Sequence, residues 1–220
     1  MPASSNFQEA IREAQSSGLV GPNVVNKALP FVGGGMVLTA GGVMGGLAMM
    51  ASNPAAFMPL FWVALIGNFI LFFVAQNVAT KGNNSTALPL LAAYSLLTGF
   101  TLSGLVALAI GTAGIGAIGT AALATGVTFV VASVMGRRMS DSVGQALSGV
   151  VGLGVLGLLI AGFGTVLFVG AAFVDFYTMP RTYRDDQYLA GALGMYLTYI
   201  NLFIFILRLI IALQGGGRRD

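Results

Sequence analysis

The sequence predicts an all-α integral membrane protein, a bundle of seven transmembrane helices, with six as the alternative, in which the C-terminal helix is central. Hydrophobic residues make up 56% of the 220 residues and charged residues 8%, against about 45–50% and about 25% in soluble domains. The apolar residues form runs long enough to cross the roughly 30 Å hydrocarbon layer of a bilayer. The Lys and Arg residues, apart from Arg208, lie in the short loops between these runs and in the two termini.

Composition also excludes several classes of function. The chain contains no Cys and no His, which removes disulfides, thiolate nucleophiles, histidine bases, His-based zinc sites and bis-histidine haem ligation. An intramembrane aspartyl protease needs two carboxylates, and the apolar runs contain one, Asp175. The net charge of +3 reflects basic loop residues and does not indicate nucleic-acid binding. We therefore expect no enzyme, no cofactor and no metal site.

The chain divides into three segments. Residues 1–29 are polar and lack the cationic start and short apolar core of a cleaved signal, so we expect them to stay on the mature protein as a tail, which the Lys and Arg count places in the cytoplasm. Within this tail, residues 6–15 can form a short amphipathic helix capped by Asn6, which is either interfacial or part of a solvated tail. Residues 30–214 form the transmembrane bundle, and residues 215–220 form a polar tail.

The first predicted span, residues 31–50, is rich in glycine. Gly41 with Gly45, and Gly42 with Gly46, form two GxxxG pairs, which allow helix backbones to approach closely. The cluster lacks the Lys-Ser/Thr ending of a phosphate-binding loop. Close helix packing is therefore the favoured interpretation.

Polar side chains mark the second and third predicted spans, residues 60–79 and 87–109. Asn68 near the middle of the second span either lines a path or forms an interhelical hydrogen bond. The hydroxyls of the third span indicate either satisfied helix packing or one wall of a polar cavity. These hydroxyl-bearing residues are Tyr94, Ser95, Thr98, Thr101 and Ser103.

After a fourth span at residues 120–136, the number of spans depends on the run 145–178. Its roughly 34 apolar residues are too many for one comfortable span and few for two. Both alternatives place seven basic residues on one side and two on the other, and both place the N-terminus in the cytoplasm. With two spans, residues 181–186 are also cytoplasmic. Asp175 lies about one turn before Pro180, so it is either an interfacial or a functional carboxylate.

The last predicted span, residues 188–213, carries a polar stripe that we expect to face the other helices. Asn201 and Arg208 lie in this stripe, and in lipid an unpaired amide or guanidinium costs at least a few kcal/mol. We expect both to find partners on neighbouring helices, or at the interface in the case of Arg208. The full stripe consists of Gly191, Gly194, Thr198, Asn201, Phe205 and Arg208.

Three stretches together resemble the bacterial branch of the Bax inhibitor-1 family of multi-pass membrane proteins. They are the segment from FILFFVAQNVATKGNNST to FTLSGL, the GRRMSDSV loop, and the ending YLTYINLFIFILRL. The resemblance implies six helices around a central seventh. It also implies a plasma-membrane location, or a thylakoid membrane in a photosynthetic host.

Two departures from the family pattern affect function. Family members that leak calcium carry an acidic pair, whose positions fall here on Tyr177 and Thr198, with Asp175 two residues from the first. A calcium site usually needs more than one carboxylate, so we expect poor calcium conduction. The stretch from Asp141 to Tyr177 is also about a dozen residues shorter than the family spacing, which keeps the six-span alternative open.

The resemblance implies a non-enzymatic regulator, assembly factor or subunit of a membrane protein complex. Its expected partners are the lipid bilayer and other integral membrane proteins, such as a membrane protease or a larger complex. The alternative is a leak channel or transporter for calcium or coupled protons. The residues that favour this alternative, as a polar core or ion path, are Asn68, Asp175, Tyr177, Thr198, Asn201 and Arg208.

Overall fold

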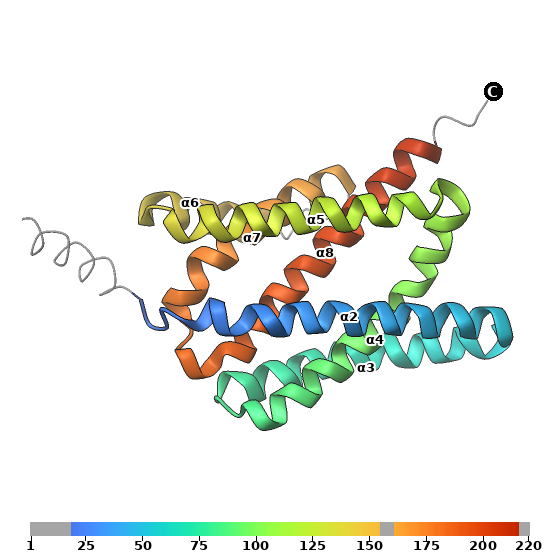
Figure 1. Cartoon of the computed structure of the whole chain (residues 1–220), viewed down its shortest axis with the longest axis horizontal. Helices are drawn as coiled ribbons and strands as arrows, with labels where there is room; N and C mark the ends of the chain where they lie inside the picture. Colours follow the sequence, from blue (N-terminus) through green and yellow to red (C-terminus); the bar gives the residue numbers. More distant parts are fainter. Residues whose placement is uncertain (1–18, 155–160, 216–220) are drawn as a thin grey trace, which may run out of the picture.

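The structure is a computed structural model that describes residues 19–154 and 161–215. The predicted all-α fold is confirmed, because the described residues form helices joined by short turns (Figure 1). The predicted helix in residues 6–15 and the tail from residue 216 lie outside them. The α-helices are α2 (Val24–Ser52), α3 (Pro54–Thr80), α4 (Asn84–Ala113), α5 (Ile115–Met135), α6 (Asp141–Gly154), α7 (Ala161–Thr182) and α8 (Tyr188–Gly215), with short 3-10 helices at Gly136–Arg138 and Asp185–Gln187.

Two of the turns are much shorter than the sequence predicted. Asn53 alone separates α2 from α3, and its side chain accepts a hydrogen bond from the Ala56 amide. Pro54 then occupies the first turn of α3, where its missing N–H is tolerated. Gly114 alone separates α4 from α5 with a φ of +78°, a conformation that favours glycine. The helices therefore extend through most of the segments expected as turns.

Six of the described helices are long and apolar enough to cross a membrane: α2, α3, α4, α5, α7 and α8. The described part of α6 has 14 residues, or about 21 Å of helix. It runs antiparallel to α7, since Gly144 faces the Tyr177 ring and Gly170 faces Leu147 and Val151. The described residues of the run 145–178 thus lie in two paired helices, of which α7 is among the six long and apolar enough to span a membrane.

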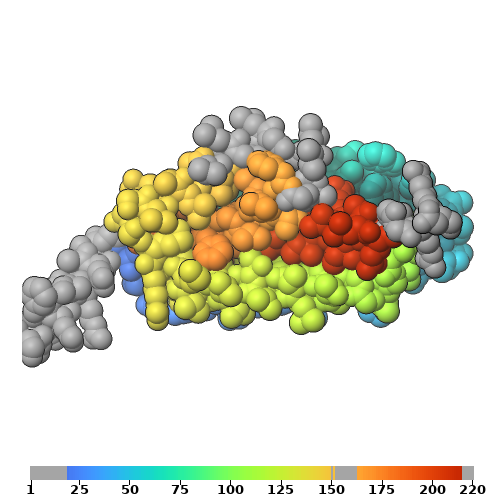
Figure 2. Space-filling model, turned by 90° about the horizontal axis from the view of Figure 1, so that it is seen from above, coloured from blue at the N-terminus to red at the C-terminus, as the bar shows by residue number. Residues whose placement is uncertain are grey.

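The central position expected for the last helix is confirmed. α8 contacts α2, α3 and α4 as well as α5 and α7, and it runs between these two groups (Figure 1). In Figure 2, α6, α7 and α8 lie next to one another on the face seen from above, with α5 along their edge. The large side chains of Leu193, Tyr196, Leu202 and Leu207 on α8 are fully buried.

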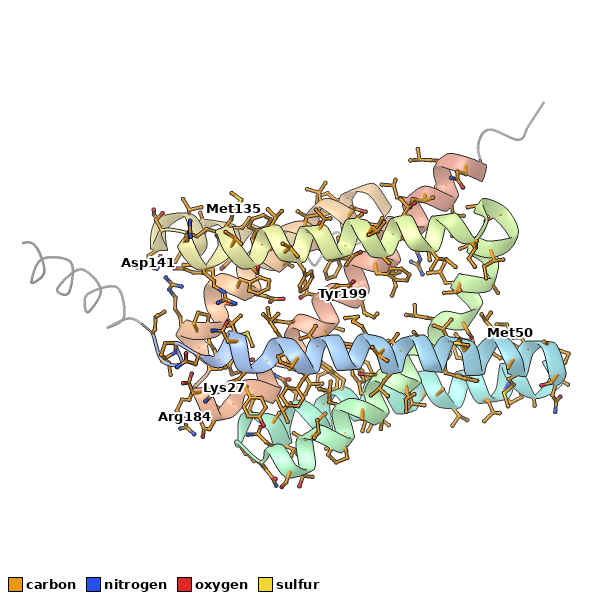
Figure 3. All side chains as sticks on the ribbon, viewed as in Figure 1. Lys27, Met50, Met135, Asp141, Arg184 and Tyr199 are labelled. Atoms are coloured by element: carbon orange, nitrogen blue, oxygen red, sulfur yellow. The ribbon has the colours of Figure 1, made fainter. Side chains whose placement is uncertain are left out.

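The basic residues gather at one end of the bundle, which we call the basic end. It contains the start of α2, the α3–α4 turn, the α5–α6 turn and the α7–α8 turn. Figure 3 shows Lys27, Asp141 and Arg184 at this end and Met50 at the opposite end. Among the described residues, the cations at the basic end are Lys27, Lys81, Arg137, Arg138, Arg181 and Arg184.

Glycines bring α2 and α4 into close contact. A Cβ atom at Gly42 would collide with the Leu96 carbonyl and lie against Gly99, and one at Gly46 would collide with Ser103. Gly41 and Gly45 are instead exposed on the outer surface of α2. Of the two GxxxG pairs, Gly42 with Gly46 therefore packs against another helix within the chain, and Gly41 with Gly45 does not.

Candidate functional site

The candidate site centres on Asp175, the acidic residue of α7 that the sequence left open. Its carboxyl lies near the Thr198 hydroxyl on α8. The other face of the carboxyl is not satisfied, because Oδ2 is buried and has no hydrogen-bond partner among the described residues. Asp175 is therefore inside the bundle and faces the central helix.

A pocket of about 150 Å³ lies beside Asp175, between α7, α8 and the turn that joins them. On the α8 side the lining includes two glycines, and on the α7 side it includes two threonine hydroxyls and a methionine. Such a space with an unpaired carboxylate oxygen can hold a hydrogen-bond donor, such as water, or a cation. Its lining is Asp175, Thr178, Met179, Thr182, Tyr183, Gly191, Gly194 and Met195.

Tyr177, one of the two positions where the resemblance implies an acidic pair, does not line this pocket. It points to the opposite side of α7, where its hydroxyl donates to Asp141 Oδ1 at 3.0 Å. The Arg181 guanidinium lies 4.0 Å from the centre of the Tyr177 ring and pairs with Asp141 at 3.3 Å. Tyr177 therefore fastens α6 to α7, and Asp175 takes the place facing Thr198.

Asn68 forms the interhelical hydrogen bond that was one of its two expected roles. The Asn68 amide nitrogen donates to Thr98 Oγ1 at 3.1 Å. The same Thr98 oxygen lies 3.2 Å from Asn68 Oδ1 and 2.8 Å from the carbonyl oxygen of Tyr94, one turn earlier on α4. These bonds join α3 to α4. Asn68 is thus occupied and lies apart from the Asp175 pocket.

The hydroxyls of α4 are likewise engaged in packing. Ser95 donates to the Leu91 carbonyl at 2.9 Å, and Ser103 donates to the Phe100 carbonyl at 2.6 Å. On α2, Thr39 Oγ1 lies 2.5 Å from the Tyr196 hydroxyl and 3.2 Å from the Ser95 carbonyl. These contacts favour satisfied packing over a polar cavity wall.

The polar stripe on α8 is buried in its first half and open at its end. Thr198 is buried, whereas Asn201 is half-buried and donates to the Leu197 carbonyl of its own helix at 2.9 Å. Arg208 is exposed. Among the described contacts Asn201 therefore bonds its own helix and not a neighbouring one, while the exposure of Arg208 agrees with the interfacial alternative expected for it. Arg208 lies about 30 Å along α8 from Tyr188, where its long side chain can reach the far interface.

The turn between α7 and α8 ties the basic end together. Asp185 Oδ1 accepts the Asn23 backbone N–H at the start of α2 at 2.9 Å, and its Oδ2 lies 3.7 Å from the Lys27 ammonium. The Asp186 carbonyl accepts a bond from Asn84 at 2.7 Å. Arg184 donates two bonds to the Asp186 carboxylate, which raises the pKa of Arg184 above its ordinary value.

Several of these residues carried no clear signal in the sequence. Thr182 and Tyr183 belong to a loop that looked like a simple connection, and Thr39 is a lone hydroxyl in a glycine-rich run. Their roles depend on which helices are neighbours. Three or more acidic side chains close enough to share a metal ion do not occur in residues 19–154 and 161–215.

Comparisons with known proteins agree with this architecture. Residues 21–215 match the family described as "Inhibitor of apoptosis-promoting Bax1". A relative named Bax inhibitor 1, from Schizosaccharomyces pombe, is 37% identical over 59 residues, which cover 27% of this chain and 22% of the relative. Because the family match extends over almost all of the described bundle, the chain belongs to the Bax inhibitor-1 family of multi-pass membrane proteins.

Proposed function

We propose that this protein acts by binding other integral membrane proteins, as a non-enzymatic regulator, assembly factor or subunit of a membrane complex. The observation that carries the proposal is that most polar side chains described inside the bundle are bonded to one another or to the backbone. Asn68 pairs with Thr98, and Thr39 pairs with Tyr196. Such bonds stabilise helix packing and leave few oxygen atoms to coordinate a permeating ion.

Orientation is part of the same proposal. Cytoplasmic loops of membrane proteins carry an excess of Lys and Arg, and the basic end collects the α2 start and three turns. We therefore assign the basic end to the cytoplasm. A membrane protease or another partner with a cytoplasmic part would then meet the α3–α4, α5–α6 and α7–α8 turns.

One observation favours a second function, an ion leak. Asp175 Oδ2 is buried without a partner beside the 150 Å³ pocket, and a buried unpaired carboxylate is costly enough to suggest a use. Against it, Thr198 replaces a second carboxylate. A single acidic group with one hydroxyl is a weak calcium site, since Ca²⁺ takes six to eight oxygen ligands.

Two measurements on one preparation distinguish these functions. The full-length protein is purified in mild detergent, co-purifying proteins are identified, and calcium flux is recorded after reconstitution in liposomes. We expect a stoichiometric membrane-protein partner, and flux near background that stays flat between pH 6 and 8. Calcium flux that varies over this pH range and disappears in Asp175→Asn would establish the leak and contradict the first proposal.

A further inference from the structure

A second cavity, unrelated to Asp175, lies on the outer surface between α2 and α4 near the basic end. It is a groove of about 390 Å³. Gly35 and the buried Leu91 form its floor, while Phe31 and the exposed Leu88 form walls. Every lining residue is apolar or glycine: Pro30, Phe31, Gly34, Gly35, Val37, Leu38, Leu88, Leu91 and Ala92.

Gly34 lines the groove without a side chain to fill it. A Cβ atom built at Gly34 would meet nothing within 4 Å, whereas one at Gly35 would press against Tyr196 and Ser95. The Phe31 wall is held in place by Tyr188 of α8, whose ring centre lies 5.3 Å away. The groove is therefore a fixed surface feature between braced helices.

A positive charge stands at the basic end of this groove. Lys27, Phe31 and Gly34 follow the i, i+4, i+7 spacing of a single helix face, so Lys27 lies directly beyond the groove. Its side chain is 48% exposed, its ion pair with Asp185 is long at 3.7 Å, and it donates to the Asp185 carbonyl at 3.3 Å. An ammonium has three N–H donors, which leaves capacity for another acceptor.

We propose that this groove binds one acyl chain of an anionic phospholipid from the leaflet at the basic end, with the lipid phosphate at Lys27. From Pro30 to Leu38 the groove follows about 12 Å of helix, within the half of the bilayer nearest the basic end. Its apolar lining matches a hydrocarbon chain, and Lys27 matches a phosphate at the depth where headgroups begin. The first turns of α2 and α4 contain no acidic residue, and the one carboxylate beside Lys27, that of Asp185, also accepts hydrogen bonds from the Asn23 backbone N–H and side-chain amide.

The size of the groove argues against a protein helix as its occupant. A helix with its side chains is about 10–12 Å wide, so only one face of it could enter a groove between two neighbouring helices. A single flexible hydrocarbon chain is narrow enough to enter.

Photocrosslinking tests the proposal with the full-length protein. Phosphatidylglycerol carrying a photoreactive diazirine on one acyl chain is incorporated into nanodiscs with the protein, and labelled residues are mapped by mass spectrometry. We expect label to concentrate between Phe31 and Leu38 and between Leu88 and Ala92. Label spread evenly over the exposed faces of α2, α3 and α5 would overturn the proposal.

Two matched pairs of variants make the test specific. Gly34→Leu fills the groove and should abolish its label, while Gly33→Leu, which also has open space but does not line the groove, should leave it. Lys27→Gln should weaken labelling by about fivefold at limiting lipid, as expected for one cation near an anionic headgroup. Lys81→Gln, at the α3–α4 turn, should have little effect.

Three results would count against the lipid. Equal groove labelling in Gly34→Leu and the parent protein would show that the chain does not occupy the groove. Equal groove labelling in Lys27→Gln and the parent protein would contradict the proposed contact between the lipid phosphate and Lys27. Efficient disulfide formation between two copies of a Val37→Cys variant would show that a second protein chain covers the groove instead.

Discussion

The buried oxygen of Asp175 is costly for the protein. A buried polar atom without a hydrogen bond destabilises the folded state by about 1–3 kcal/mol, and Asp175 Oδ2 is such an atom. Residues that lower stability in this way are commonly kept for function.

We expect Asp175→Asn to unfold at the same temperature as the parent protein or at a higher one. The substitution keeps the shape of the side chain and removes a charge from the bundle interior. Thermal unfolding in detergent measures the effect. Asn68→Leu is the control, because it breaks the Asn68–Thr98 pair and should cost about 0.5–1.5 kcal/mol. A loss in Asp175→Asn as large as that of the control would identify Asp175 as a structural residue.

Arg208 should be nearly neutral for stability. It is exposed near the far end of α8, and side chains that extend from a helix end to the interface contribute little to packing. We expect Arg208→Leu to change the free energy of unfolding by less than about 0.5 kcal/mol. Arg181→Leu should be more damaging, since Arg181 donates to the Tyr177 carbonyl at 2.7 Å and pairs with Asp141. Equal losses in the two variants would contradict the exposed position of Arg208.

At the scale of helices, the α2–α4 contact depends on two particular glycines. A methyl group at Gly42 would collide with the backbone of α4, which cannot move aside as a side chain could. At Gly45 a methyl group would meet nothing within 4 Å. Sequence spacing alone gave the two GxxxG pairs equal weight, because it does not say which face of α2 meets α4.

We expect Gly42→Ala to lower the free energy of unfolding by about 1–3 kcal/mol through overpacking. Gly45→Ala should be neutral or stabilising by up to about 1 kcal/mol, since alanine favours a helix more than glycine does. Thermal unfolding of both variants in the same detergent checks the difference. A larger loss for Gly45→Ala than for Gly42→Ala would mean that the outer face of α2 packs against another protein.

The helices themselves were predictable from the sequence, and their ends were less so. Long apolar runs identify spans regardless of what surrounds them. The turn between the first two predicted spans was predicted too long, since Pro54 and Pro59 in that segment are both accommodated within α3. Gly114 is one of several glycines in the segment between the third and fourth predicted spans, although it alone makes the break between α4 and α5.

The candidate site was only partly predictable because it depends on rotation of α7 about its axis. Asp175 and Tyr177 are two residues apart, so they point to different sides of a helix. The structure turns Asp175 towards Thr198 and Tyr177 towards Asp141. All three positions, Asp175, Tyr177 and Thr198, were candidates from the sequence. Which of the two α7 residues faces Thr198 follows only from the way α7 packs against α6 and α8.

At the scale of the whole molecule, the α7–α8 turn joins segments that are distant in the sequence. Val20 and Gly21 donate to the Pro180 carbonyl, both at 2.9 Å, and Gln187 donates to the Thr80 carbonyl. The start of α2, the α3–α4 turn and the last two helices thus meet at the basic end. All of them must lie on the same side of the membrane.

This arrangement allows a test of orientation with single cysteines, since the chain has none of its own. Thr182 is exposed at the basic end, and Ser52 is exposed at the opposite end beside Asn53. Because basic loops are retained in the cytoplasm, we expect Thr182→Cys to resist a membrane-impermeant thiol reagent added outside intact cells. Ser52→Cys should react, and Thr182→Cys should react after permeabilisation. Labelling of Thr182→Cys and not of Ser52→Cys in intact cells would show that the orientation is the opposite one. Labelling of both variants in intact cells would show that α6 and α7 do not both cross the membrane.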